Sequence, residues 1–254
     1  ALKTKGIRPK LAVLVMADDA AGQLYSRLKQ AAAQRVGIEL EKHEFSFQEL
    51  KLIMQKIGDL NRDHQVQGIM IQHPGINWGK KHQLNRRSFE MWWRQLAEVI
   101  AADKDVDGLR ENSKFIPATV RAVELILSIY KSVGDRKADY IAVVGSQGMI
   151  GRQLVRRLKA FGVDIETKDL AKITKKADIL ISCTGKQNLI KADMVKVGAT
   201  VIDVGWPKGD VDFESVVQKA GFITPVPGGV GPITVVCLLE NLVNCLYTGS
   251  TDDD

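Results

Sequence analysis

Short apolar runs alternate with amphipathic segments along the first hundred residues of the chain. The run Leu11-Ala-Val-Leu-Val-Met16 is continuously apolar, which is typical of a parallel strand buried on both faces. Further strands are predicted at 38–45 and 68–72, and helices are predicted between the strands at 22–36 and 48–61. This order of elements predicts an α/β fold with a parallel sheet.

The first predicted helix has its apolar residues on one side and a glycine at its end. Gly37 occupies the position after the last periodic residue, where glycine commonly terminates a helix. The apolar positions that share one face are Leu24, Leu28, Ala31, Ala32 and Val36.

A second series of the same kind begins at Tyr140, after a Trp-rich stretch with a helix predicted near 91–101. Its strands are predicted at 140–144, 163–166, 178–182 and 200–204. A helix is predicted at 150–161, between the first two of these strands, and an apolar helix at 233–246 closes the chain. Two successive βαβ series indicate two α/β layers.

Composition and charge favour a soluble globular protein over a nucleic-acid-binding or membrane protein. The hydrophobic content of 45% and charged content of 26% are ordinary for a soluble globular protein. The net charge of +6 is spread over interleaved acidic and basic residues, so a nucleic-acid partner is disfavoured. The sequence shows no apolar signal region and no run of membrane-spanning length, and its 3 cysteines do not suggest a disulfide framework. We therefore expect a cytoplasmic protein without a membrane partner.

A glycine-rich turn follows the strand at 140–144 and precedes a helix. Gly145, Gly148 and Gly151 would let the backbone approach a pyrophosphate, and the helix N-terminus would supply amide donors. In this strand–turn–helix context a dinucleotide site is favoured over a plain turn. Glu166, at the end of the next predicted strand, is placed to hold the adenosine ribose, although a solvated carboxylate would also fit.

A second group of polar residues lies in the first half of the chain. Tyr25 and Lys29 stand four residues apart on one helix face, which is compatible with simple packing or with a lysine poised for proton transfer. Gln72 ends a predicted parallel strand, where α/β sheets place their ligands, but it could also cap a loop. Asp105 and Asp107 in Lys104-Asp-Val-Asp-Gly108 are turn formers or ligand-binding carboxylates, and no third residue is spaced for a metal.

The segment TPVPGGVGP, at 224–232, is too dense in proline and glycine to form a regular strand. Its glycines would allow close approach of the backbone to a ligand, and Pro232 would lie near the start of the last helix. We therefore expect a stiff ligand-lining loop rather than a simple connection.

Taken together, the motifs resemble those of the bifunctional methylenetetrahydrofolate dehydrogenase/cyclohydrolase family. They follow one order from about Leu11 to Asn244: QLYSRLK, QGIMIQHP, DKDVDG, the glycine turn, ADILISCTGK, VGATVIDVG, GDVDF and TPVPGGVGPIT. The resemblance implies a catalytic folate-binding α/β domain at 1–119 plus 232–254, to which the C-terminal helix returns. It also implies a Rossmann-type NAD(P)-binding domain at 120–231, with the folate between the two domains.

The resemblance further implies two reactions on a tetrahydrofolate derivative. Methylenetetrahydrofolate would be oxidised with NAD or NADP to methenyltetrahydrofolate, which would then be hydrolysed to formyltetrahydrofolate. The matching lysine, Lys29, would be the general acid/base, with Gln72 orienting it, Tyr25 lining the pocket and Asp107 binding the pterin ring. The loop bordering the folate would comprise Gly228, Gly229, Val230, Gly231, Pro232 and Ile233. The dinucleotide would contact Gly145, Ser146, Gln147, Gly148, Ile150, Gly151, Glu166, Thr184 and Gly185.

Some positions depart from the family pattern. Ser146 and Gln147 stand where the family usually has Arg-Ser, and Glu166 occupies the region that often holds a ribose phosphate. A lost cation and an added carboxylate favour NAD over NADP, although Lys168 keeps NADP possible. The altered turn also leaves an alternative, a cyclohydrolase-only or folate-binding relative without dinucleotide-dependent activity. Homodimerisation is a further expectation from the family.

Overall fold

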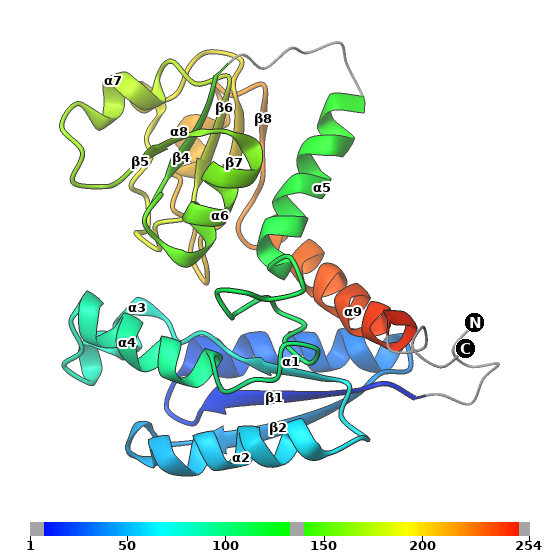
Figure 1. Cartoon of the computed structure of the whole chain (residues 1–254). Coiled ribbons are helices and arrows are strands. Elements are labelled where there is room, and N and C mark those ends of the chain that lie inside the picture. The colour runs from blue at the N-terminus through cyan, green and yellow to red at the C-terminus, as the bar shows by residue number, and fades with distance from the viewer. Residues whose placement is uncertain (1–7, 133–139, 249–254) are drawn as a thin grey trace. The chain divides into compact units, whose positions relative to one another are not determined.

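The computed structural model describes residues 8–132 and 140–248, which form two compact units. The first unit comprises Ala1–Ala118 and Val235–Asp254, and the second comprises Thr119–Thr234. Each unit contains one parallel β-sheet (Figure 1). The predicted α/β class with two α/β domains is thus confirmed.

The sheet of the first unit has the strand order β2-β1-β3, with all strands parallel. The central strand β1 (Lys10–Met16) lies between β2 (Glu39–Phe45) and β3 (Gly68–Ile71). Helices α1 (Ala20–Arg35) and α2 (Leu50–Arg62) lie on opposite faces of this sheet (Figure 1). Because the strand order turns around at β1, the carboxyl ends of β1 and β3 form the edge at which such sheets bind ligands.

Helix α1 buries its polar face rather than its apolar face. Its buried positions are Gly22, Ser26, Lys29 and Ala33. Leu24 and Leu28, on the apolar face recognised in the sequence, are 40% and 48% exposed. Amphipathic helices ordinarily bury the apolar stripe, so this reversal marks α1 as a helix with a role beyond packing.

The Trp-rich stretch forms two helices, where the sequence predicted one near 91–101. Helix α3 spans Ile76–Lys81, and α4 spans Arg86–Ala97. The start of α4 is fixed by Asn85, whose side chain accepts a hydrogen bond from the Ser88 amide at 2.9 Å. Aromatic rings from both helices then pack into the core of the first unit, with Trp78 and Trp92 5.3 Å apart between centroids.

The second unit contains a five-stranded parallel sheet in the order β5-β4-β6-β7-β8. Its strands are β4 (Ile141–Val144), β5 (Phe161–Val163), β6 (Ile179–Ser182), β7 (Thr200–Asp203) and β8 (Phe222–Ile223). Its helices are α5 (Ala118–Ser132), α6 (Met149–Leu158), α7 (Leu170–Thr174) and α8 (Phe213–Val216), joined by the first turn of α9 (Val230–Thr248). The order turns around at β4, so the ligand edge lies at the carboxyl ends of β4 and β6.

One strand of the second unit lies earlier in the chain than predicted. We expected a helix to Phe161 and a strand at 163–166, but α6 ends at Leu158 and β5 spans Phe161–Val163. Lys159 adopts a left-handed conformation with φ 52°, which stops the helix. Glu166 therefore lies in the turn after β5 rather than at the strand end, and Asp164 is the acidic residue that directly follows the strand.

The carboxyl-terminal helix α9 is tied to the first unit by a buried amide. Asn241 Nδ2 donates to the carbonyl oxygens of Val106 at 2.8 Å and Ile116 at 3.1 Å. Leu242, next in sequence, packs over Gly68 of β3, where a Cβ atom would lie 2.5 Å from its Cδ1. Within 8–132 and 140–248, none of the helices, α9 included, combines the length and apolar character that crossing a membrane requires.

Replacing Asn241 by Leu should destabilise the protein. Both carbonyl oxygens would stay buried after losing their amide partner, at a cost of about 1–3 kcal/mol for each unsatisfied group. Guanidinium-induced unfolding would measure the change, with Val236→Ala, at a half-exposed position of the same helix, as the control. An unfolding midpoint equal to that of the control would contradict the anchoring role of Asn241.

Candidate active site

The buried amine of Lys29 brings together three of the residues singled out in the sequence. Lys29 is 3% exposed, and its Nζ donates to Gln72 Oε1 at 2.8 Å. The same nitrogen lies 4.5 Å from the centroid of the Tyr25 ring, within cation–π range. Met70 of β3 completes the surroundings, with its Sδ 3.4 Å from Nζ. An amine from α1 is thus held against the end of β3, at the ligand edge of the sheet.

Burial sets the protonation of this amine. It lowers the pKa of Lys29 from its usual 10.5 to about 8, while the negative charge of Asp107 acts in the opposite direction. Burial also raises the pKa of Asp107, against the influence of the Lys29 charge. Lys29 can consequently lose and regain a proton close to neutral pH, as a general acid/base requires.

The two aspartates of the KDVDG loop have different structural positions. Asp105 is fully buried, and its carboxylate accepts hydrogen bonds from the amides of Leu109 at 2.9 Å and Arg110 at 3.0 Å. Asp107 is only half-buried and is electrostatically linked to Lys29. Asp105 therefore shapes the loop, and Asp107 is the carboxylate available to the site.

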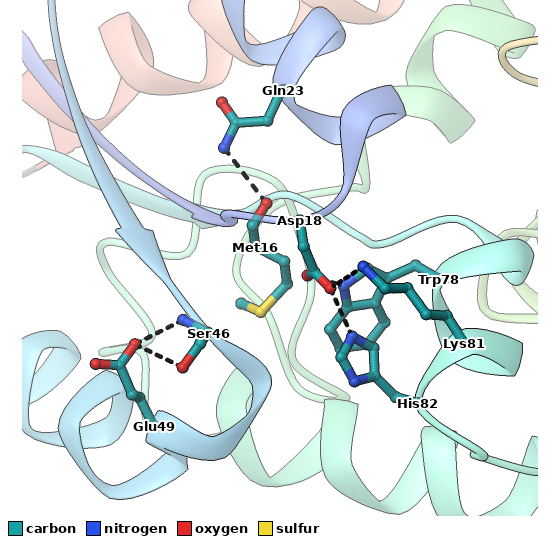
Figure 2. A network of polar contacts seen from close by, with 8 residues as sticks. All are labelled: Met16, Asp18, Gln23, Ser46, Glu49, Trp78, Lys81 and His82. Carbon is teal, nitrogen blue, oxygen red and sulfur yellow. Dashed lines mark hydrogen bonds and ion pairs between the residues drawn. The ribbon is translucent and has the colours of Figure 1, made fainter.

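Two further acidic residues, Asp18 and Asp19, follow β1 at the same edge and were not identified from the sequence. Asp18 accepts hydrogen bonds from Trp78 Nε1 at 2.6 Å and Lys81 Nζ at 2.7 Å, and lies 2.9 Å from His82 Nε2 (Figure 2). Burial alone would raise the pKa of Asp18, but these contacts lower it to about 2. Asp18 thus holds α3 to the end of β1.

The glycine turn of the second unit has the close approaches that only glycine permits. Gly145 has φ +87°, and a Cβ atom there would lie 2.7 Å from the Cys183 carbonyl oxygen. A Cβ atom on Gly151 would lie 2.1 Å from the Gly145 carbonyl oxygen. Because β4 and β6 are neighbours, Gly145 meets the segment that continues to Thr184 and Gly185. The turn and this segment form a backbone-lined cradle at the switch point, which fits a dinucleotide pyrophosphate.

A carboxylate closes one side of this turn. Asp164 accepts a hydrogen bond from Ser146 Oγ at 3.0 Å and from the Gln147 amide at 3.2 Å. Thr167 Oγ1 accepts one from the Asp164 amide at 3.0 Å. The sequence suggested Glu166 for this position because the strand was expected to end later.

The proline- and glycine-rich segment is part loop and part helix. Gly228 has φ +108°, and the Gly229 amide donates to the Pro225 carbonyl oxygen at 2.9 Å. Helix α9 begins at Val230, so the last three residues of the segment lie in its first turn, with Pro232 as the third residue of the helix. Proline is tolerated there because first-turn amides have no intrahelical partner. In the described part of the chain, no group of three or more His, Cys, Asp or Glu residues is arranged to hold a metal ion.

Comparison with protein families matches both parts of the chain to one enzyme family. Residues 1–107 match the catalytic domain of tetrahydrofolate dehydrogenase/cyclohydrolase. Residues 117–249 match the NAD(P)-binding domain of the same enzyme.

Individual relatives agree with this match over nearly the whole chain. The bifunctional protein FolD of Nautilia profundicola is 41% identical, across 95% of this chain and 88% of that protein. FolD of Methanosarcina barkeri is 38% identical, across 96% and 88%. The crystal structure of the bifunctional enzyme FolD from Campylobacter jejuni has a TM-score of 0.81 at 33% identity, covering 98% of this chain and 91% of that one. The chain belongs to the tetrahydrofolate dehydrogenase/cyclohydrolase family.

Proposed function

We propose that Lys29 carries out proton transfer in the cyclohydrolase half of the family's bifunctional reaction. The protein oxidises methylenetetrahydrofolate to methenyltetrahydrofolate with NAD(P) and hydrolyses the product to formyltetrahydrofolate. The observation that supports the role of Lys29 is its buried amine, 2.8 Å from Gln72 Oε1 and with a pKa lowered to about 8.

The two steps make different demands on the protein. In the oxidation, a bound NAD(P) would supply the acceptor for the hydride of the methylene bridge, so the chain has to orient the reactants rather than move a proton. In the hydrolysis, water attacks the methenyl carbon, and the neutral amine of Lys29 accepts a proton from it. The resulting ammonium returns this proton to the ring nitrogen when the carbon–nitrogen bond breaks, and the hydroxyl group of the adduct loses its proton to solvent as the formyl C=O forms. Proton transfer by one positioned group of this kind contributes about 10²–10⁴-fold.

The other residues of the site would bind and orient the folate. Gln72 would hold the amine of Lys29, and the Tyr25 ring would line the pocket beside it. The Asp107 carboxylate would accept hydrogen bonds from the N–H groups of the pterin edge, which are stronger than neutral ones because the acceptor is charged. The folate-bordering residues would be Gly228, Gly229, Val230, Gly231, Pro232 and Ile233.

The nucleotide contacts would come from the cradle of the second unit. They would involve Gly145, Ser146, Gln147, Gly148, Ile150, Gly151, Glu166, Thr184 and Gly185. We infer that the nucleotide is NAD rather than NADP, because Asp164 places a carboxylate against this turn at the end of β5. A carboxylate there can accept hydrogen bonds from a ribose and repels a 2′-phosphate.

The expected assembly is a homodimer in the cytoplasm. Strand β2 is an edge strand of the described sheet, so it and its neighbouring helices are the proposed interface. Size-exclusion chromatography with light scattering would measure the assembly, and a monomer at micromolar concentration would exclude it.

Replacing Lys29 by Met should abolish hydrolysis while leaving oxidation in place. The variant loses the proton-transfer group, so methenyltetrahydrofolate hydrolysis should fall at least about 100-fold. Absorbance of the methenyl compound measures both steps on one preparation. Lys42→Met, at an exposed lysine of the same unit, is the matched control and should hydrolyse at the wild-type rate. Hydrolysis by Lys29→Met at the control's rate would refute the proposal.

The pH dependence of hydrolysis should report the protonation of Lys29. The neutral amine is the base, so the rate at saturating substrate should rise with pH through about 8. Asp107 raises the pKa of Lys29, so Asp107→Asn should lower that pKa and move the rising limb to lower pH. Single-turnover rates from pH 6 to pH 10 would measure the shift. A limb that stayed in place or moved to higher pH would contradict the coupling of the two groups.

Asp164→Ser should shift the nucleotide preference toward NADP. Without the carboxylate, the 2′-phosphate of NADP is no longer repelled. The ribose hydroxyl of NAD also loses a hydrogen-bond acceptor. The measurement is kcat/KM for each nucleotide in the methylenetetrahydrofolate oxidation assay. The wild type should prefer NAD. In the variant, the ratio of kcat/KM with NAD to kcat/KM with NADP should fall about 10-fold or more, which corresponds to the loss of one charge-assisted interaction. Glu166→Gln is the control, and a larger effect there than at Asp164 would return the role to Glu166.

A further inference from the structure

Asp19 lies near the Gln72 side chain, across the bare backbone of Gly22, but has no role in the reaction as described so far. It precedes α1 at the carboxyl end of β1 and is 5% exposed. A Cβ atom on Gly22 would lie 2.4 Å from Asp19 Oδ2 and 3.1 Å from Gln72 Cγ. The carboxylate and the Gln72 side chain therefore occupy adjoining space over the bare backbone of Gly22.

The usual structural explanation accounts for this aspartate only in part, although the amides of Ala21, Gly22 and Gly75 lie near its carboxylate. An aspartate at the N-cap of a helix ordinarily accepts a hydrogen bond from a first-turn amide, but the Asp19 side chain makes no such cap. Its Oδ2 is buried and has no hydrogen-bond partner among the described residues. Burial raises the pKa of Asp19, and the nearby amides of Gly22 and Gly75 oppose that shift only in part. A buried carboxylate oxygen without a partner is unfavourable and requires a reason.

The Gln72 amide supplies a reason. Its Oε1 accepts from Lys29 at 2.8 Å, while its Nε2 has only a long contact, 3.4 Å, to the His73 carbonyl oxygen. The two ends of an amide are almost identical in shape, so only their partners decide which end faces the amine. An ionised carboxylate accepts hydrogen bonds and cannot donate them, so it attracts the NH₂ end.

We propose that Asp19 is a positioning residue of the cyclohydrolase step, which holds the Gln72 amide with its oxygen toward Lys29. It acts through Gln72, because Asp107, and not Asp19, is the carboxylate that acts on the charge of Lys29. This role rests on the proposed function of Lys29. The neighbouring Asp18 does not share it, since its carboxylate is occupied by Trp78, Lys81 and His82.

The orientation of Gln72 affects the chemistry of Lys29 in a defined direction. An amide oxygen facing Nζ accepts a hydrogen bond from the ammonium and so stabilises the charged form. With the amide turned, an NH₂ group would face the ammonium and favour the neutral amine. Losing the influence of Asp19 should therefore lower the pKa of Lys29 and misorient its proton.

Two substitutions test this role by different routes. Asp19→Asn keeps the shape of the side chain but adds a donor, so Gln72 is no longer held in one orientation. Gly22→Ala keeps the carboxylate but places a methyl group 2.4 Å from the present position of Oδ2, so Asp19 has to move. Alanine is favoured over glycine within a helix, so this change does not by itself disfavour α1.

Each variant should lower kcat for methenyltetrahydrofolate hydrolysis about 10- to 100-fold, the usual effect of a small misplacement of a reacting group. KM should change little, the oxidation rate should be retained, and the rising limb of the hydrolysis pH profile should move to lower pH. In the double variant Asp19→Ala/Gly22→Ala the methyl group meets no carboxylate, and its 3.1 Å approach to Gln72 Cγ can relax into the space that the carboxylate leaves. The fold-decrease in kcat of this double variant should equal that of Asp19→Ala alone. It should not equal the product of the fold-decreases of Asp19→Ala and Gly22→Ala.

Asp18→Asn is the matched control for the loss of a carboxylate at this edge. It removes contacts to α3 and should lower the melting temperature without moving the pH profile. Multiplicative losses in the double variant, or the same pH shift in Asp18→Asn, would overturn the role of Asp19. If Asp19→Asn is silent while Lys29→Met is inactive in hydrolysis, only this inference fails. An active Lys29→Met would instead remove the proposed function on which it rests.

Discussion

The buried amine of Lys29 is the constraint on which the first unit depends. An ammonium removed from water is strongly unfavourable unless neighbouring groups replace its hydration. Gln72 and the Tyr25 ring surround it, and Asp107 contributes an opposite charge. These groups come from α1, the end of β3 and the loop after α4. The three segments are distant in sequence, and the fold has to place them closely enough for Lys29 to form its hydrogen bond.

The KDVDG loop shows how the fold supplies that accuracy. Asp105 fixes the loop from within by accepting two backbone amides, and Asn241 of α9 fixes it from outside through the Val106 carbonyl oxygen. Asp107, the next residue, is consequently held by the carboxyl-terminal helix although α9 supplies no charge of its own there. A helix far along the sequence thereby contributes to the electrostatics of Lys29.

Both units place their functional groups at the point where the strand order of a parallel sheet reverses. Each sheet is parallel and turns around at its first strand, β1 or β4, so two strand ends lie side by side at one edge. In the first unit this edge carries side chains, among them Asp19 and Gln72. In the second it carries bare backbone, because Gly145 and Gly151 leave no space for a side chain. Side chains suit proton transfer, whereas exposed amides suit a phosphate group.

The sequence predicted the parts of the fold whose signals are local. Continuously apolar runs such as the one ending at Met16 identified buried strands, and the glycine turn identified the start of α6. Strand β5 was misplaced because it has only three residues, Phe161–Val163, with a glycine in the middle. Such a short segment contains no continuous apolar run, and only Val163 is buried. Local patterns carry little information about an element so short.

The candidate site was less predictable from local pattern. Tyr25, Lys29 and Gln72 were found through motifs in a family order, since a spacing of four residues alone fits ordinary packing equally well. Asp18 and Asp164 were missed because their partners are fixed by tertiary structure. Asp18 meets Lys81, 63 positions away, and Asp164 meets Ser146, 18 positions away. Only the position of these aspartates within two residues of a strand end could have indicated them.

Helix α1 is the element for which the sequence pattern and the observed burial disagree most clearly. Its apolar residues Leu24 and Leu28 are exposed, while Ser26 and Lys29 are buried. Packing alone would favour the opposite rotation, so burial of the polar face has to be maintained by the contacts that this face makes. Two of the buried polar atoms that lack a hydrogen-bond partner among the described residues, Asp19 Oδ2 and Ser26 Oγ, lie at the start of α1 and on this same face. Departures from local rules that gather on one helix face, at the ligand edge of a sheet, are what a functional site requires of an otherwise well-packed domain.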